Sequence, residues 1–125
     1  MRLATAAALA ASDARTLAPD AFPLDFELVT DSRTLAPGQV FLALRGERFD
    51  GHAFVREALA RGAGGLIVAD AAVVPSGVGA LVVTDTTAAL LACARLARDA
   101  SPARFVAITG SVGKTTTKAF LAQLL

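Results

Sequence analysis

Several residue types are scarce in this 125-residue chain, and each shortage excludes a class of protein. Tryptophan and tyrosine are absent, which removes the aromatic platforms on which most single-stranded nucleic-acid binders stack bases. The lone cysteine, Cys93, excludes a disulfide framework or a Cys/His metal site, and its alanine-rich surroundings predict a small buried side chain. A net charge of +1, with arginines scattered along the chain, excludes a stripe that binds polyanions such as nucleic acid.

Long apolar runs are also missing. No stretch approaches the roughly 18 residues that a membrane helix needs, so we expect no membrane insertion. The alanine-rich segment 1–11 has two interpretations, a signal peptide or a short helix with Leu3 and Leu9 facing inward. The weak apolar region and single side-chain charge favour the helix, which fits a cytoplasmic protein.

The remaining pattern predicts an α/β fold, a small mixed sheet flanked by helices, because strand-like and helix-like segments alternate. Residues 12–23 are expected to be a loop. Strands are expected at residues 25–30, 39–44, 65–69 and 80–83. Helices are expected at residues 52–61 and 84–99.

The helix expected at residues 52–61 has its own start and stop signals. Asp50 is a natural N-cap and Gly62 a natural end. Glu57 and Arg61 are spaced to form an ion pair on the outer face. The face expected to be buried consists of Phe54, Val55, Ala58 and Leu59.

A phosphate-binding loop is predicted near the C-terminus, after a strand at residues 104–108. The sequence there contains the short form GxxGKT, although Ile108 stands where the full P-loop pattern has a glycine. We expect Lys114 to reach the terminal phosphates of ATP and the Thr115 hydroxyl to hold Mg²⁺. The ATP phosphates are expected to lie against Gly110, Ser111, Val112, Gly113, Lys114, Thr115 and Thr116.

The alternative for this segment is an ordinary turn followed by a polar helix start. Composition argues against it, because Lys114 and Lys118 are the only lysines in a chain that otherwise uses arginine. A compact ammonium at the P-loop position is therefore favoured. Lys118 is equally well explained as a solvated helix residue.

A domain boundary is predicted where helix-forming residues end, near residues 100–103. Residues 1–102 form one expected domain, and residues 103–125 form the incomplete beginning of an ATP-binding domain. One strand and one helix cannot form a stable domain alone. We therefore expect the protein to continue beyond Leu125.

Four segments together resemble the Mur ligase family of peptidoglycan synthesis. These are the DSR sequence at 31–33, the PGQVFLAL sequence at 37–44, the GERFDGHAF sequence at 46–54 and the GSVGKT sequence at 110–115. Their order and spacing are most similar to the branch that adds D-alanyl-D-alanine to UDP-N-acetylmuramoyl-tripeptide. Ala119 departs from the acidic residue that many such sequences carry.

The resemblance implies which residues bind substrate. In related ligases the first domain holds the UDP moiety, here through Thr30, Ser32, Glu47, Arg48 and Phe49. Each of these residues also has a structural alternative. Ser32, like Asp31, would then cap a turn. Arg48 would be a solvated loop residue, and Phe49 would belong to the core. Asp50 is expected to be a helix cap, and His52 a first-turn helix residue rather than a catalyst.

The resemblance also implies a reaction. ATP would phosphorylate the terminal carboxylate of the UDP-linked tripeptide, and the amine of D-alanyl-D-alanine would displace phosphate, with Mg²⁺ as cofactor. The full-length enzyme is expected to be a cytoplasmic bacterial monomer. The chain itself is expected to bind UDP without turning over ATP.

Other functions stay open at this point. The sister ligase that adds the third stem-peptide residue is one alternative, although its P-loop more often reads GTNGKT. A P-loop ATPase or kinase with an unrelated N-terminal domain is another, and a non-catalytic UDP-sugar-binding module is a third.

Overall fold

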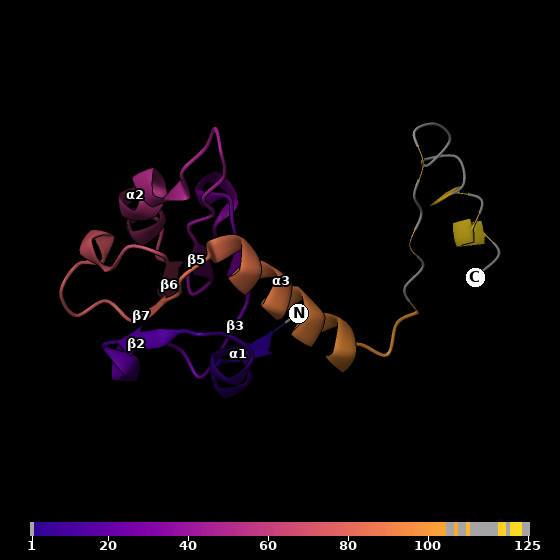
Figure 1. Ribbon diagram of the computed structural model, residues 1–125, viewed down its shortest axis with the longest axis horizontal. Helices are drawn as coiled ribbons and strands as arrows, with labels where there is room; N and C mark the ends of the chain where they lie inside the picture. The colour runs from indigo at the N-terminus through magenta and orange to yellow at the C-terminus, as the bar shows by residue number, and fades with distance from the viewer. Residues whose placement is uncertain (1, 105–106, 108–109, 111–117, 120, 124–125) are drawn as a thin grey trace.

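The computed structural model describes residues 2–104, 107, 110, 118–119 and 121–123. Within these residues the fold has a five-stranded sheet with helices on both faces (Figure 1). Most of the expected strand at 104–108 and most of the expected phosphate loop lie outside the described residues. The α/β fold that the sequence predicts is therefore confirmed for the part that precedes the loop.

The main sheet has the strand order β2-β7-β6-β5-β4. Its strands are β2 (Arg15–Leu17), β4 (Leu28–Val29), β5 (Val40–Leu42), β6 (Gly65–Val68) and β7 (Ala80–Val82). The four strands from β4 to β7 run parallel, and β2 pairs antiparallel with β7. The carboxyl ends of four strands therefore meet at one edge of the sheet, where α/β proteins often bind ligands.

Side chains of the central strands alternate between two hydrophobic cores, as period-two geometry requires. Val40 and Leu42 face a core formed with α1 (Thr5–Ala11) and α3 (Thr86–Ala100). Phe41 faces the opposite core, formed with α2 (Val55–Ala60). Both faces of the sheet are covered, which explains why β5, β6 and β7 are apolar along their whole length.

The helix α3 begins at a side-chain cap. The Asp85 carboxylate accepts hydrogen bonds from the backbone N–H groups of Thr87 and Ala88 at 2.8 and 3.1 Å, which fixes the first turn of α3. Cys93 is buried on the inner face of this helix, as its surroundings predict. The burial raises the pKa of the Cys93 thiol. It therefore acts as a small apolar residue.

The N-terminal region differs from the prediction. Residues 12–23 are not a continuous loop, because β2 forms there and the 3₁₀ turn η1 (Pro19–Ala21) follows it. The expected strand at 25–30 is divided into β3 (Asp25–Phe26) and β4, and β3 pairs with β1 (Leu3–Ala4) in a separate two-stranded sheet. Whether these short strands form depends on pairing with residues that are distant in the sequence, so local pattern does not predict them.

The expected helix at 52–61 begins as a 3₁₀ turn, η3 (Gly51–Phe54), before α2. Tighter 3₁₀ winding changes the direction of each side chain relative to an α-helix. Phe54 is consequently 37% exposed, whereas the sequence predicts it on the buried face with Val55. The predicted pair between Glu57 and Arg61 is present, with 3.4 Å between Oε1 and Nε.

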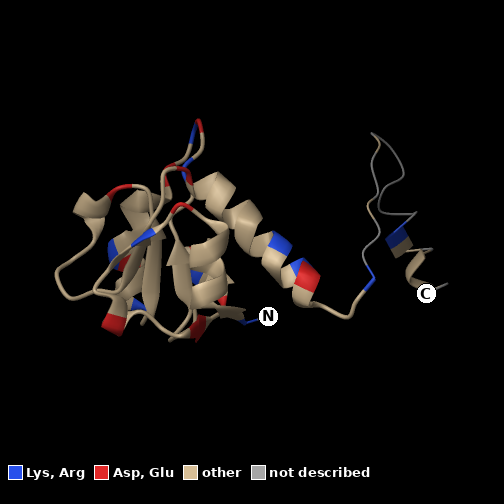
Figure 2. Ribbon diagram, turned by 60° about the horizontal axis from the view of Figure 1, so that its bottom comes forward, with Lys and Arg blue, Asp and Glu red and all other residues tan. Residues whose placement is uncertain are grey.

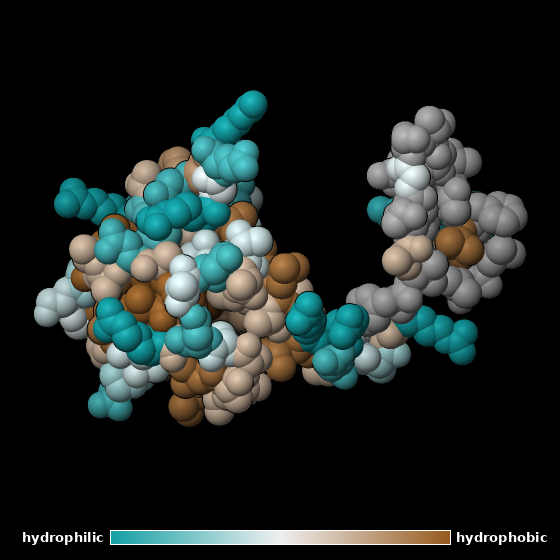
Figure 3. Space-filling model, in the orientation of Figure 1, coloured by the Kyte–Doolittle hydropathy of each residue, from teal (hydrophilic) through white to brown (hydrophobic). Residues whose placement is uncertain are grey.

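In the described part of the chain, Lys and Arg positions are interspersed with Asp and Glu positions (Figure 2). No helix in the described ranges is long and apolar enough to cross a membrane. Hydrophobic and hydrophilic residues are interspersed on the face shown in Figure 3. Leu91 of α3 is 55% exposed.

Candidate functional site

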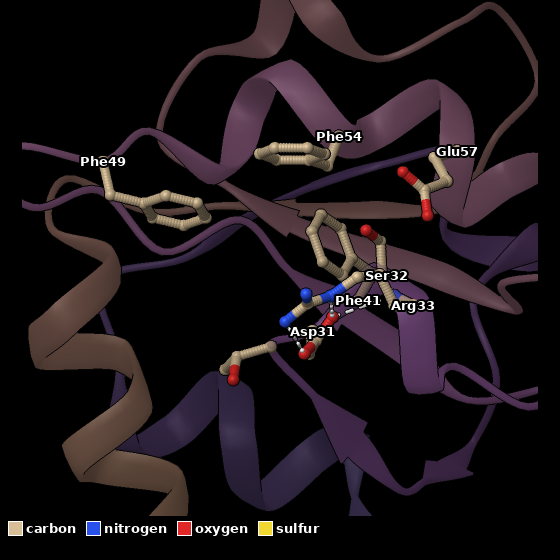
Figure 4. A pocket seen from close by; sticks show the side chains of 8 residues that line it. Asp31, Ser32, Arg33, Phe41, Phe49, Phe54 and Glu57 are labelled. Carbon is tan, nitrogen blue, oxygen red and sulfur yellow. Dashed lines mark hydrogen bonds and ion pairs between the residues drawn. The ribbon is translucent and has the colours of Figure 1, made fainter.

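A pocket of about 360 Å³ lies at the carboxyl edge of the sheet, beside the ends of β4 and β5. Figure 4 shows the rings of Phe49 and Phe54 on one side, the Asp31–Arg33 ion pair on the other and Phe41 between them. The pocket thus combines aromatic surface with charged groups of both signs. Its lining residues are Thr30, Asp31, Ser32, Arg33, Phe41, Phe49, Phe54 and Glu57.

The polar wall is the 3₁₀ turn η2 (Ser32–Thr34), which follows β4. The Asp31 carboxylate accepts a hydrogen bond from the Arg33 backbone N–H at 2.9 Å and pairs with the Arg33 guanidinium at 2.9 Å. Hydrogen bonding to Arg33 lowers the pKa of Asp31 to about 2. Asp31 therefore acts as a turn cap, which is the structural alternative that the sequence left open, and it holds an arginine beside the pocket.

Ser32 is held inside this turn, between Asp31 and Arg33. It is 5% exposed, and it still contributes to the pocket lining. Its hydroxyl can both donate and accept a hydrogen bond. A small polar ligand that enters the pocket could therefore bind this group directly.

The aromatic wall comes from the loop that follows β5. The loop is closed by an antiparallel bridge between Arg45 and Asp50 and by a hydrogen bond from the Gly46 N–H to the Phe49 carbonyl at 2.7 Å. Phe49 is 51% exposed and stacks on Phe54, with 5.7 Å between ring centroids and 15° between planes. An exposed stack of this kind offers a flat surface to a planar ligand.

Asp50 and His52 lie between Phe49 and Phe54 in the sequence. The Asp50 carboxylate accepts from the His52 backbone N–H at 3.0 Å and lies 2.6 Å from the His52 ring nitrogen Nδ1. These hydrogen bonds lower the pKa of Asp50. Asp50 is the predicted cap, although it caps η3 rather than an α-helix.

The structure brings together three of the five residues that the sequence predicts to bind UDP. Thr30, Ser32 and Phe49 line the pocket. Glu47 and Arg48 are exposed in the same loop as Phe49, and they are not among the lining residues. Their predicted contacts with a ligand stay predictions.

Sequence reasoning missed several lining residues. Phe41 occupies the middle position of β5, so its alternation with Val40 and Leu42 could have placed it on this face. Phe54 was assigned to the core. Glu57 and Arg33 reach the pocket because η2 packs near α2, which no local pattern reveals.

The predicted ATP site lies almost entirely outside the described residues. Ser111, Val112, Gly113, Lys114, Thr115 and Thr116 all fall there, and of the predicted loop only Gly110 is described, with a φ of 140°. In the part of the chain that the structure does describe, no cluster of three or more His, Cys, Asp or Glu could hold a metal ion. The roles of the predicted ATP-site residues therefore stay predictions from sequence.

Comparison with known proteins gives one family. The sequence matches the family described as "Mur ligase family, catalytic domain" over residues 27–110. A UDP-N-acetylmuramoyl-tripeptide:D-alanyl-D-alanine ligase from Escherichia coli is 45% identical over 98 residues, which cover 78% of this chain and 21% of that protein. A UDP-N-acetylmuramoyl-L-alanyl-D-glutamate:2,6-diaminopimelate ligase from Agrobacterium fabrum is 38% identical over 97 residues, covering 78% of this chain and 19% of that protein.

A solved structure gives the same result for the fold. The UDP-N-acetylmuramoylalanyl-D-glutamyl-2,6-diaminopimelate:D-alanyl-D-alanyl ligase from Acinetobacter baumannii superposes with a TM-score of 0.83 at 34% identity. The match covers 99% of this chain and 28% of that one. The chain spans about a fifth of the length of the curated relatives that it matches.

Proposed function

The chain belongs to the Mur ligase family, and we propose that it is the N-terminal part of an ATP-dependent amide ligase that makes peptidoglycan precursors. In this proposal residues 1–102 bind the UDP moiety of the acyl substrate. Residues 103–125 begin the ATP-binding domain, whose remaining parts would follow. The enzyme would act in the bacterial cytoplasm.

The pocket beside β4 and β5 is the observation that carries the UDP-binding role. It joins Ser32, which offers a hydroxyl, to Phe49 and Phe54, which offer a flat apolar surface. A uracil base can stack on an aromatic ring and hydrogen-bond through its carbonyl and N–H groups. The pocket has a volume of about 360 Å³, which suits part of a nucleotide rather than a whole UDP-sugar.

The charged residues near the pocket suit the diphosphate. Arg33 lines the pocket, and Arg48 lies in the exposed loop next to Phe49. Guanidinium groups bind phosphate oxygens with paired hydrogen bonds. In this proposal Arg48 would bind a diphosphate that leaves the pocket toward solvent, while the base stays against Phe49.

The proposed reaction joins a carboxylate to an amine. A carboxylate oxygen of the UDP-linked tripeptide attacks the γ-phosphorus of ATP, and ADP leaves. The amine of D-alanyl-D-alanine then attacks the acyl carbon, forming the amide, and inorganic phosphate leaves with the former carboxylate oxygen. ATP thus turns a poor leaving group into a good one.

Lys114 and Thr115 have the proposed roles at the ATP phosphates. The Lys114 ammonium would lie against the oxygens of the transferred phosphoryl group, where negative charge increases during transfer. The Thr115 hydroxyl would hold Mg²⁺, which neutralises charge on the phosphates when bound. These roles rest on the GxxGKT sequence.

Titration of the 125-residue chain with UDP tests the binding proposal. We expect saturable binding by calorimetry, with NMR shifts at Ser32, Phe49 and Phe54. Uridine should bind more weakly and reach the same residues, because it lacks the diphosphate. A folded sample that shows no response to millimolar UDP would overturn the proposal.

The sister activity, addition of the third residue of the stem peptide, is a second candidate. The relative from Agrobacterium fabrum, named for 2,6-diaminopimelate, favours it. The higher identity to the D-alanyl-D-alanine ligase from Escherichia coli favours the first candidate. Assay of the whole enzyme with D-alanyl-D-alanine and with diaminopimelate as acceptor distinguishes the two.

A further inference from the structure

His52 is the single histidine of the chain, and its side chain is 5% exposed. It lies outside the lining of the proposed UDP pocket and next to another pocket of about 500 Å³, between α2 and the 3₁₀ turn η4 (Ala71–Val73). A buried imidazole in such a place is available for metal binding or proton transfer only if a ring nitrogen is free.

Both ring nitrogens of His52 are occupied. Nε2 accepts a hydrogen bond from the Ala69 backbone N–H at 2.9 Å, so this nitrogen carries no proton. Nδ1 must then carry the proton and donate to the Asp50 carboxylate at 2.6 Å. The imidazole is therefore neutral and held in one tautomer, which excludes it as a metal ligand or proton shuttle.

These two bonds connect the aromatic loop to the centre of the sheet. Ala69 directly follows β6, which lies between β5 and β7. Asp50 directly follows Phe49, and it also pairs with Arg45 at the other end of the loop, with 3.3 Å between Nε and Oδ2. The imidazole thus connects a loop tip to the end of a central strand. Loop tips are usually mobile, whereas central strands are rigid.

The same bridge is close to both rings of the aromatic wall. Phe49 and Phe54 lie on either side of Asp50 and His52 in the sequence, three or fewer residues from the imidazole. The direction of each ring depends on how the chain turns between them. That turn is η3, and its cap is the Asp50 carboxylate that His52 holds.

We infer that His52 is a positioning residue for the proposed UDP pocket: its neutral imidazole, bonded to Asp50 and Ala69, holds the stacked rings of Phe49 and Phe54 in place. The inference rests on the proposed function only for the identity of the ligand. It differs from a purely stabilising role, because loss of the bridge lowers the affinity of molecules that are still folded.

Two substitutions separate the two bonds. In His52→Gln the amide oxygen can take the place of Nε2 and accept from the Ala69 N–H. In His52→Asn the amide nitrogen can take the place of Nδ1 and donate to Asp50, while the Ala69 N–H loses its acceptor. Arg56→Gln is the matched control, because Arg56 is exposed and lines the same second pocket.

UDP affinity of the three folded variants is measured by calorimetry at pH 7.5. We expect His52→Asn to bind UDP at least about fivefold more weakly, the lower end for loss of one base–aromatic stack. His52→Gln keeps the Ala69 bond but loses the bond to Asp50, so it also breaks the bridge and should likewise bind UDP at least about fivefold more weakly, whereas Arg56→Gln should bind like the parent chain. Unchanged affinity of folded His52→Asn would overturn the inference.

Two measurements without ligand keep this test separate from the test of the proposed function. Long-range proton–nitrogen NMR spectra should show the tautomer with its proton on Nδ1, and an Nε2-protonated ring would contradict the bridge. Cross-relaxation between the Phe49 and Phe54 rings should be present in the parent and in Arg56→Gln, and lost in both His52→Gln and His52→Asn. If the parent binds no UDP, the proposed function fails while these ring contacts still decide the role of His52.

Discussion

The backbone N–H of Arg45 donates a hydrogen bond to the hydroxyl of Thr86 at 3.0 Å, across 41 residues of sequence. Arg45 begins the loop that carries Phe49, and Thr86 begins α3. The first turn of α3 and the base of the aromatic loop are therefore one hydrogen-bonded unit. The site depends on the start of this helix as well as on its own lining residues.

Thr86→Val should destabilise the fold. The substitution keeps the shape of a side chain that is 2% exposed and leaves the Arg45 N–H without its acceptor. Loss of one part-buried hydrogen bond costs about 0.5–1.5 kcal/mol, and urea denaturation measures this loss. Thr87→Val is the matched control, because Thr87 is exposed and the same change there should stay within about 0.5 kcal/mol.

Phe49→Ala should weaken UDP binding without unfolding the chain. Phe49 is 51% exposed, so its removal leaves no large cavity, but it removes the outer ring of the stack. Loss of one base–aromatic contact costs about 1–3 kcal/mol, which calorimetric titration with UDP would detect. Leu91→Ala, which removes an exposed apolar side chain from α3, should bind UDP like the parent.

Gly51→Ala should be far more harmful than Gly46→Ala, although both glycines belong to the same loop region. A methyl group at Gly51 would lie 2.8 Å from the Leu44 backbone nitrogen, whereas at Gly46 the nearest atom is 3.9 Å away. Overpacking against backbone costs about 1–3 kcal/mol. Equal urea midpoints for the two variants would contradict the close packing of η3 on Ala43 and Leu44, which follow β5.

Asp31→Asn should change how the free energy of unfolding depends on pH. The folded-state pKa of Asp31 is lowered from 3.8 to about 2, so its ionised form stabilises the fold above pH 4. This contribution is lost as pH falls through the interval from 3.8 toward 2. The difference in urea midpoint between the parent and Asp31→Asn should shrink over that interval. A difference that stays constant between pH 5 and pH 2 would mean that the Asp31–Arg33 pair does not form.

Lys114→Ala should abolish ligase activity in a protein that carries the remaining domains. Removal of a charge that stabilises the transferred phosphoryl group costs about a hundredfold or more in turnover. Binding of the UDP-linked substrate should be unchanged, because it uses the pocket near Phe49. Lys118→Ala is the control with the other lysine of the chain, and its activity should resemble that of the parent.

Much of the fold follows from local sequence. The apolar runs that become β5, β6 and β7 are buried on both sides, and the Asp85 cap marks the start of α3. These features are predictable because every neighbour that decides them is a few residues away. The strand β2 is different, since its polar sequence Arg15-Thr16-Leu17 becomes a strand only by pairing with β7.

The residues of the candidate site also divide into those that local sequence predicts and those that depend on distant contacts. Ser32 and Phe49 could be predicted because they lie in short motifs that resemble the family. Phe54 could not, because the boundary between the 3₁₀ turn and α2 changes its direction. The bond between His52 and Ala69 spans 17 residues and depends on the packing of η3 beside β6, which no periodicity reveals.

The length of helix α3 fixes the distance between the segments at its two ends. Its 15 residues, at about 1.5 Å each, place its two ends about 22 Å apart. One end touches the aromatic loop through Thr86, and the other reaches Ser101, beside the proposed domain boundary. The first turn of α3, bonded to the aromatic loop, and Ser101 at its other end are thus held a fixed distance apart by one continuous helix.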